Sequence, residues 1–240
     1  MSSLNPNVEV FNRDVEANAG YLYTTNTRLS SRMATDRSTD AILETAVFKD
    51  RLVLDMGCGD GFYTVRFFDR GAPRALVGAD AANQAIAAAA SRADARPVRF
   101  VVADAHRMPF PDDSFDVVLV QSILHHDDDP GAMIREAFRL APTIVIHEPN
   151  GNNFGLKLIE KLSPYHREHN EKSYSARQLS QWIENAGGFV SLKRYAGFVP
   201  MFSPDSLAKV MKVLEPVVER LPVVNALACA VCVLVATRQT

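Results

Sequence analysis

The sequence predicts an α/β protein with a doubly wound, Rossmann-like sheet of seven strands. Three observations point to this fold class. Short apolar runs alternate with helical patterns, a glycine-rich turn (GCGDG, residues 57–61) follows the first run, and acidic residues stand at the ends of the first three runs. Strands of such sheets are mostly parallel and buried on both faces, and ligands bind at their carboxyl ends.

The expected strands are the apolar runs, beginning with RLVLD at residues 51–55. The others are 75–80, 98–104, 115–121, 143–148, 189–194 and 228–237. Helices are expected at 62–70, 81–93, 130–140 and 176–186. Alanine, the strongest helix former, dominates 81–93, and Gly187–Gly188 give a natural end to the last helix. Five strands separated by helices favour a parallel sheet.

Three further segments lie outside this alternation. In the N-terminal segment we expect a helix begun by Ser38 or Thr39. After the fifth strand, residues 150–175 contain a short amphipathic helix, and between the sixth and seventh strands Ser203 is expected to cap a helix that starts at Pro204. The apolar side of the first helix comprises Phe154, Leu156, Leu158, Ile159 and Leu162, and that of the second Leu207, Val210, Met211 and Leu214. Residues 221–227 read as a loop before the last strand.

Composition describes an ordinary globule. Of the 240 residues, 47% are apolar and 22% charged, and the formal charge of −2 gives no electrostatic reason to expect nucleic acid as a partner. Three cysteines and a polar N-terminal sequence, MSSLNPNVEV, predict a cytoplasmic protein. Cys229 and Cys232 lie in an apolar run, which favours a buried strand over a redox or metal pair.

The glycine turn is the strongest local signal. Gly57, Gly59 and Gly61 allow a tight turn and a close approach to a ligand, and a helix starting near Phe62 would direct its positive end there. The spacing G-x-G-x-G is one residue tighter than the dinucleotide fingerprint G-x-G-x-x-G. Cys58, inside the turn, reads as a small loop residue and not as a nucleophile.

Three strand-end carboxylates accompany the turn. Asp55 ends the first strand, Asp80 the second, and Asp104, followed by Ala105, the third. Asp80 stands where an acidic side chain can accept hydrogen bonds from ribose hydroxyls, and Asp104 where one can meet an adenine amino group. A lone strand-end aspartate is often only a helix cap or a turn former, but three beside one glycine turn indicate a nucleotide-type site.

Together these motifs resemble those of class I S-adenosylmethionine-dependent methyltransferases, in the broad group that includes the ubiquinone and menaquinone biosynthesis methyltransferases. The resemblance rests on VLDMGCGDG, VGADAA and VVADAHRMPFPDDSFDVVLV, within residues 51–149. It implies that the last strand is antiparallel and inserted between the fifth and sixth. It also implies a single domain with helical lid elements, with an N-terminal lid at 1–47, a cofactor-binding core at 48–150 and substrate-side insertions at 151–240.

The resemblance implies S-adenosylmethionine as cofactor and a set of contacts to it. Its methionine part would meet the backbone of Gly57, Cys58 and Gly59, with Asp55 orienting the loop and Gln121 nearby. Its ribose would meet Asp80, and its adenine Ala81, Asp104 and the Ala105 amide. Tyr21 or Tyr23 would close over the cofactor, or else pack within the lid.

A base is needed only where the acceptor must lose a proton. His125 and His126, in ILHHDDDP after the fourth strand, are the first candidates, since histidine titrates near neutrality. Positioning the substrate is an equal alternative for them. His147, paired with Glu148, is a second candidate. A metal held by the histidines and Asp127–Asp129 is conceivable on composition, but a helix-capping turn before Pro130 is favoured and no metal is expected.

The expected partner is a small or amphipathic acceptor, such as a quinone, lipid, sugar or natural product. The amphipathic insertions either wall an acceptor pocket, which is the favoured interpretation, or rest on a membrane as a peripheral contact. The oligomeric state stays open. Two alternatives remain: a non-catalytic binding module with a methyltransferase fold, and a nicotinamide-dependent oxidoreductase, which the tighter glycine spacing disfavours.

Overall fold

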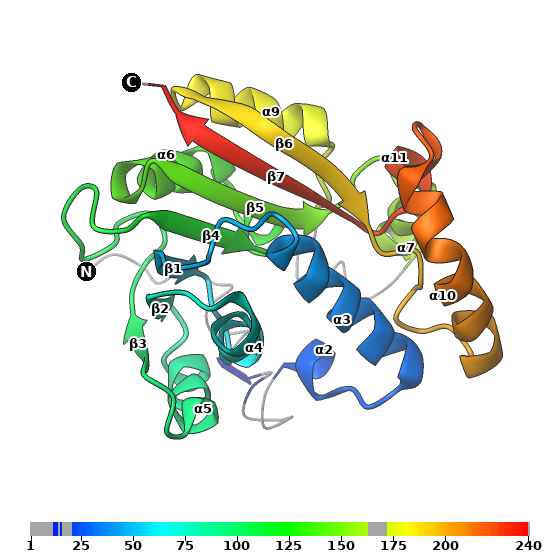
Figure 1. Cartoon of the computed structure of the whole chain (residues 1–240), viewed down its shortest axis with the longest axis horizontal. Helices are drawn as coiled ribbons and strands as arrows, with labels where there is room; N and C mark the ends of the chain where they lie inside the picture. Colours follow the sequence, from blue (N-terminus) through cyan, green and yellow to red (C-terminus); the bar gives the residue numbers. More distant parts are fainter. Residues whose placement is uncertain (1–11, 14, 16–20, 163–171, 240) are drawn as a thin grey trace.

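The apolar runs form one seven-stranded sheet (Figure 1). The computed structural model describes residues 12–13, 15, 21–162 and 172–239. The strands are β1 (Leu52–Met56), β2 (Ala75–Asp80), β3 (Val98–Val102), β4 (Val117–Gln121), β5 (Thr143–Pro149), β6 (Gly188–Ala196) and β7 (Val231–Arg238). Their order is β3-β2-β1-β4-β5-β7-β6, and β7 runs antiparallel to both neighbours. The predicted sheet, including the inserted antiparallel last strand, is confirmed.

Alternate side chains of the strands fill two cores, one on each face of the sheet. Leu54, Val118 and Ile146 face one core with α6 (Pro130–Leu140) and α9 (Ala176–Asn185). Val53, Leu119 and Val145 face the other. That second face is covered by α3 (Leu29–Leu43), α4 (Phe62–Gly71) and α5 (Asn83–Ala93). The remaining helices are α2 (Leu22–Thr25), the 3₁₀ turn η1 (Leu124–His126), α7 (Phe154–Leu162), α10 (Asp205–Arg220) and α11 (Val224–Ala228). None of these described helices is long and apolar enough to cross a membrane.

Three predicted helix boundaries are wrong. Ser38 and Thr39 do not start the N-terminal helix but lie inside α3, where the Thr39 hydroxyl donates to the Thr35 carbonyl one turn earlier. Ser203 does not cap α10 either. The N-cap is Pro204, whose carbonyl accepts from the Ala208 amide. The expected loop at 221–227 contains the start of α11.

A buried ion-pair network joins α3 to α10. The guanidinium of Arg37, 8% exposed, donates to Glu219 at 2.8 and 2.7 Å and to Glu44 at 3.0 Å. Glu219 also accepts from the Gly197 amide at 2.8 Å, just after β6. Removing one member of such a network leaves the others charged and poorly solvated.

We expect Arg37→Met to lower the free energy of unfolding by about 3–5 kcal/mol, because Glu219 would stay inside without its cation. The matched control is Arg96→Met. Arg96 pairs with Asp69 at the surface, where solvent screens the charges, so its loss is expected to leave the free energy of unfolding nearly unchanged. Urea unfolding followed by circular dichroism measures both variants, and equal losses would contradict a special role for the Arg37 network.

Candidate functional site

The carboxyl ends of β1, β2, β4 and β5 meet at one side of the sheet, and the glycine turn lies among them. Gly57 and Gly59 adopt φ angles of +79° and +54°. A Cβ on Gly57 would lie 2.4 Å from Cδ1 of Ile123, and one on Gly59 would lie 2.5 Å from Cε2 of Tyr21. Only glycine fits these two positions, because both the backbone and the neighbouring side chains exclude a Cβ. The Tyr21 ring therefore lies against the loop.

The first three amides of the turn already have acceptors. Those of Gly57 and Cys58 donate to the Ala79 carbonyl at 2.7 and 3.0 Å, and that of Gly59 donates to Oδ2 of Asp80 at 2.9 Å. A ligand would thus meet the carbonyls and Cα atoms of the turn. Cys58 is buried, and burial raises the pKa of its thiol well above the usual range, which agrees with its interpretation as a loop residue.

Asp80 accepts backbone amides on both carboxylate oxygens. Gly59 donates to Oδ2, and the Ala82 amide donates to Oδ1 at 2.8 Å. Burial raises the pKa of Asp80, an effect that these amides oppose. Each oxygen keeps a second lone pair, so Asp80 can still accept hydrogen bonds from a diol. Ala81 follows it at the surface of the site.

The end of β3 lies beside that of β2, and the Ala103 amide donates to the Asp80 carbonyl at 2.9 Å. Asp104 is exposed, and its Oδ1 accepts from the His106 amide at 2.9 Å. Ala105 is buried next to it. Asp80 and Asp104 thus lie at the ends of neighbouring strands, along one edge of the site. The carboxylate of Asp104 is exposed and that of Asp80 is half-buried.

Asp55 is buried beneath the turn. Its Oδ2 accepts from the Thr64 hydroxyl of α4 at 2.6 Å, which ties β1 to the helix that follows the turn. Burial raises the pKa of Asp55 to about 7, and the charge of Asp80 adds to the rise, while the Thr64 bond opposes it. The folded chain therefore holds this proton more tightly than the unfolded chain.

As the pH rises from about 4 to about 7, the unfolded chain loses the Asp55 proton first, so this group favours unfolding progressively. We expect Asp55→Asn, which keeps the shape but cannot ionise, to be more stable than the wild type above pH 7, on the order of 2–4 kcal/mol. Near pH 4 the two proteins should be similar. Guanidinium unfolding of the ligand-free chain across this pH range measures the difference, and a constant difference would contradict the assignment.

Asp60 is a site residue that the sequence analysis missed. It is 1% exposed, and its Oδ2 accepts from the Thr24 hydroxyl at 2.7 Å and from Arg92 of α5 at 3.0 Å. The Tyr21 amide approaches the same oxygen at 3.4 Å. Asp60 thereby links the N-terminal segment, the glycine turn and α5. A charged residue between two glycines of the turn was the available signal.

His125 and Glu148 form a buried pair at the ends of β4 and β5. His125 Nδ1 lies 2.6 Å from Oε2 of Glu148, which is 0% exposed. Oε1 of the same carboxylate accepts from the amides of Ile123 and Leu124, both at 2.9 Å. Because Glu148 also holds the backbone of η1, it sets the position and tautomer of the imidazole. His126 is half-buried, with its ring centroid 3.9 Å from that of His125.

The predicted pair of His147 with Glu148 is wrong. Neighbouring residues of a strand point to opposite faces, so His147 faces away from Glu148, on the side of Gln121. Gln121 is buried at the end of β4, level with His147 on β5. Both ring nitrogens of His147 lack a partner within the described part of the chain. Burial lowers the pKa of His147 to about 4, which makes it a weak base near neutral pH.

The acidic turn before α6 is a helix cap, as the sequence favoured. Oδ1 of Asp129 accepts from the Ala132 amide at 3.0 Å, with Pro130 in the first turn of the helix. Asp127 lies 2.9 Å from Nε2 of His106. Within residues 12–13, 15, 21–162 and 172–239, no three potential metal-ligating side chains gather. Cys229 and Cys232 are buried free thiols whose pKa values burial raises to about 12.

Comparison with known proteins extends these observations. Residues 54–142, from β1 to the end of α6, match the family model described as a methyltransferase domain. The demethylmenaquinone methyltransferase of Thermus thermophilus is 36% identical over 109 residues, which cover 44% of this chain and 48% of that protein. The corresponding enzyme of Thermotoga maritima is 28% identical over 167 residues, 67% of each protein. The chain thus spans about half to two thirds of these relatives.

Solved structures share the fold over nearly the whole chain. A methyltransferase from Thermotoga maritima, described as a possible histamine N-methyltransferase, has a TM-score of 0.69 at 17% identity and covers 97% of this chain and all of that one. A [4+2]-cyclase has a TM-score of 0.70 at 22% identity, covering 97% and 94%. The matched domain, the strand order and the motifs around the turn are all similar to those of class I S-adenosylmethionine-dependent methyltransferases.

Proposed function

We propose that this chain binds S-adenosylmethionine at the carboxyl ends of its strands and methylates a small metabolite whose accepting atom must lose a proton. The observation that carries this proposal is the His125–Glu148 pair, 2.6 Å apart and buried beside the glycine turn. The side chain of Ile123, two residues before His125, lies against Gly57. The candidate base and the candidate cofactor loop are therefore neighbours.

The residues around the turn suit the proposed cofactor. Asp80 would accept hydrogen bonds from the ribose hydroxyls, and Asp104 with the Ala105 amide would hold the adenine. The carbonyls of the turn would face the methionine part, below the Tyr21 ring. When bound, the cofactor supplies a methyl group activated by a sulfonium, and the chain needs chiefly to hold the acceptor in line with it.

His125 would take the proton from the acceptor. Since the Glu148 carboxylate can only accept at Nδ1, Nδ1 carries the hydrogen and Nε2 carries the lone pair of the neutral imidazole. Glu148 would then stabilise the imidazolium that forms. In this transfer the methyl group would move to the acceptor, and the electron pair of the broken carbon–sulfur bond would return to sulfur. The acceptor proton would go to His125.

The names of the relatives support acceptors of this kind. Among them are a spinach 2-methyl-6-phytyl-1,4-hydroquinone methyltransferase, 31% identical over 108 residues, and an Arabidopsis phosphoethanolamine N-methyltransferase, 30% identical over 180 residues. A hydroquinone and an aminoalcohol phosphate both present a nucleophilic atom that carries a proton. We infer an acceptor of the hydroquinone or related hydroxylated class, because a phenolic hydroxyl, with a pKa of about 10, keeps its proton near neutrality and needs a base to remove it.

Two measurements test the proposal. Calorimetric titration with S-adenosylhomocysteine should show one saturable site, whereas NAD should not bind. Release of S-adenosylhomocysteine from S-adenosylmethionine should then be followed with a panel of hydroquinones, hydroxylated natural products and amines. Binding without turnover of any acceptor would favour a non-catalytic module or a reaction like that of the cyclase sharing this fold. Binding of NAD alone would favour an oxidoreductase.

A further inference from the structure

Helix α10 turns most of its large apolar side chains outward and the acidic side chains of Glu215 and Glu219 inward. Val213 and Val217 are 78% and 56% exposed, whereas Glu215 between them is 2% exposed. The exposed residues Leu207, Val210, Leu214, Val217 and Leu221 recur every three or four positions, so they form one stripe along the helix. The sequence favours packing of the amphipathic insertions over the sheet, as walls of an acceptor pocket, whereas these side chains of α10 face solvent.

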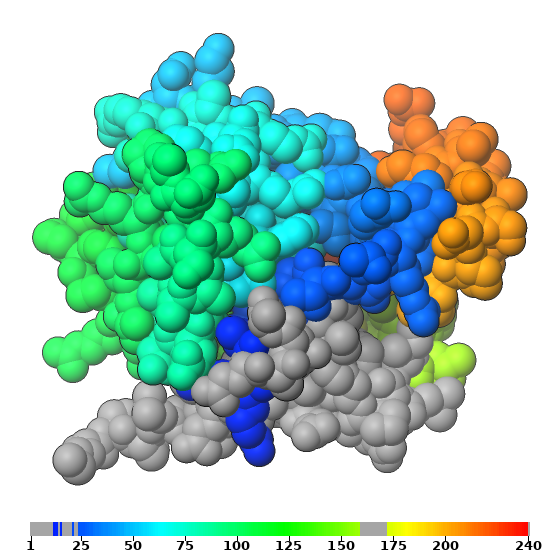
Figure 2. All heavy atoms as spheres, turned by 90° about the horizontal axis from the view of Figure 1, so that it is seen from below, coloured from blue at the N-terminus to red at the C-terminus, as the bar shows by residue number. Residues whose placement is uncertain are grey.

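The stripe continues onto the neighbouring elements. We call the α10 surface the exposed apolar side chains of α10, of α11 and of the loops that flank α10: Phe202, Leu207, Val210, Val213, Leu214, Val217, Leu221, Val223, Val224 and Leu227. α7, which contacts α11, exposes Phe154 and Leu158 as well. Figure 2 shows α10 as a ridge at the edge of the molecule, beside α3. Gathered apolar residues of this kind, as opposed to scattered ones, mark an interaction surface.

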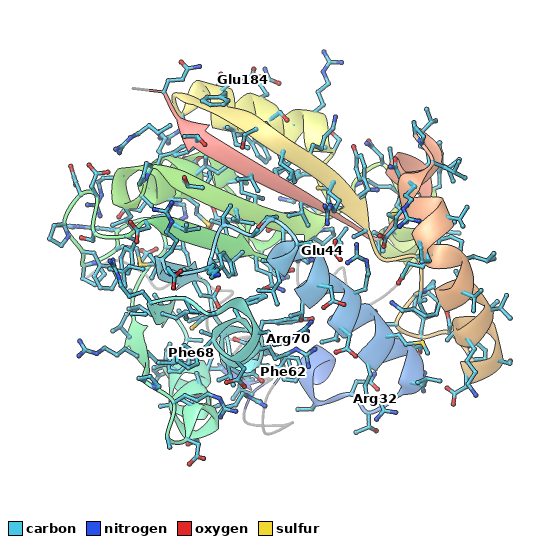
Figure 3. All side chains as sticks on the ribbon, viewed as in Figure 1. Arg32, Glu44, Phe62, Phe68, Arg70 and Glu184 are labelled. Carbon is cyan, nitrogen blue, oxygen red and sulfur yellow. The ribbon has the colours of Figure 1, made fainter. Side chains whose placement is uncertain are left out.

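The charges around the α10 surface are unbalanced. Most acidic side chains of α3 and α10 are neutralised by ion pairs: Asp36 with Arg66, Asp40 with Arg70, Glu44 and Glu219 with Arg37, and Glu215 with Lys212. Asp205, at the start of α10, is the exception. Four exposed cations on or beside these helices have no acidic partner among the described residues: Arg28, Arg32, Lys209 and Arg220. Figure 3 shows Arg32 at the outer end of α3. The surface is thus apolar with a basic border.

We propose that the α10 surface docks on an anionic lipid membrane. Apolar side chains entering the boundary between headgroups and acyl chains, with lysines and arginines around them, are the features of helices that lie on such membranes. A second copy of the chain fits less well. A two-fold interface brings the same patch of both molecules together and would oppose the four cations to one another.

The α10 surface lies close to the candidate site. The side-chain amide of Asn150, two residues after Glu148, donates to the carbonyls of Ala226 and Cys229 at 2.8 and 2.9 Å, so α11 is held at the end of β5. A bilayer against the α10 surface would therefore lie near the His125–Glu148 pair. Granted the proposed function, an acceptor with an apolar tail could enter from the membrane, but the docking itself does not depend on methyl transfer.

Sedimentation with lipid vesicles tests the docking. The full chain should bind vesicles of phosphatidylcholine mixed with phosphatidylglycerol more tightly than vesicles of phosphatidylcholine alone. The double variant Val213→Glu/Val217→Glu should bind mixed vesicles at least about tenfold more weakly, because charged side chains resist entry into the bilayer. Lys209→Gln and Arg220→Gln should each weaken binding to mixed vesicles about fivefold, and leave binding to neutral vesicles unchanged.

Val102→Glu is the matched control. Val102 is 56% exposed, like Val217, but lies on β3 at the opposite edge of the sheet, so lipid binding should not change. Because all these side chains already face solvent, the melting temperatures should stay near that of the wild type. Absence of vesicle binding, or equal binding by the double variant, would overturn the proposal. So would a lipid-free dimer that the double variant converts to a monomer. Calorimetry with S-adenosylhomocysteine, done separately, tests the cofactor site independently of these outcomes.

Discussion

Glu148→Gln is expected to lower kcat for the acceptor by about 100-fold, within the range by which general base catalysis accelerates reactions. Glutamine keeps an oxygen that can accept from the Ile123 and Leu124 amides, so η1 should hold its position. It lacks the charge that stabilises an imidazolium on His125. The affinity for S-adenosylhomocysteine should stay close to that of the wild type, because Glu148 contacts none of the candidate cofactor residues around the turn.

A purely structural role for Glu148 would give a different result. If the His125–Glu148 pair provides the base, the acid limb of the kcat–pH profile should move to lower pH in Glu148→Gln. The reason is that a histidine without its carboxylate partner is harder to protonate. A loss of kcat with a fall in melting temperature and an unchanged kcat–pH profile would instead indicate disruption of η1. Glu184→Gln, on the outer face of α9, is the matched control and should leave kcat unchanged (Figure 3).

The sheet was predictable because local signals agree with the tertiary structure. Most of the strands are apolar runs, and the predicted run at residues 75–80 coincides with β2. The place of β7 between β5 and β6 came from the resemblance to a family and not from the pattern of the residues. The role of Gln121 toward the cofactor also comes from that resemblance, whereas the roles of Asp80 and Asp104 follow from their places at the ends of strands. All three roles stay predictions.

The errors come from properties that local pattern does not carry. His147 and Glu148 are adjacent in sequence, and the alternation of a strand separates them onto two faces. The partner of Glu148 is His125, 23 positions away, which only the parallel pairing of β4 and β5 brings near. The spacing of the apolar residues of α10 is visible in the sequence, but whether they face the core or the solvent is not. Arg37 of α3 and the amides of Gly197 and Phe198 draw Glu215 and Glu219 inward, and the apolar face turns outward as a result.

Asp80→Ala is expected to raise the Kd for S-adenosylhomocysteine by about 100-fold or more. Hydrogen bonds to a charged group contribute about 1.5–3 kcal/mol each, and the proposed ribose contact would use two hydroxyls. Isothermal titration calorimetry measures the change. Asp69→Ala removes an exposed carboxylate of α4 that pairs with Arg96. It is the matched control and should leave the Kd unchanged. An unaltered Kd in Asp80→Ala would contradict the ribose assignment.

Loss of affinity alone would not prove a contact to ribose, because Asp80 also accepts from the Gly59 amide and so supports the glycine turn. A second ligand, S-adenosylhomocysteine with one ribose hydroxyl removed, separates the two roles. If Asp80 binds that hydroxyl, the wild type should bind the deoxy ligand at least about tenfold more weakly than the parent ligand. Asp80→Ala should bind the two ligands equally well, since the contact is already absent in that variant. If Asp80 only supports the turn, removal of the hydroxyl should weaken both proteins by the same factor. The coupling between the two changes, and not either change by itself, therefore decides whether this carboxylate holds the cofactor.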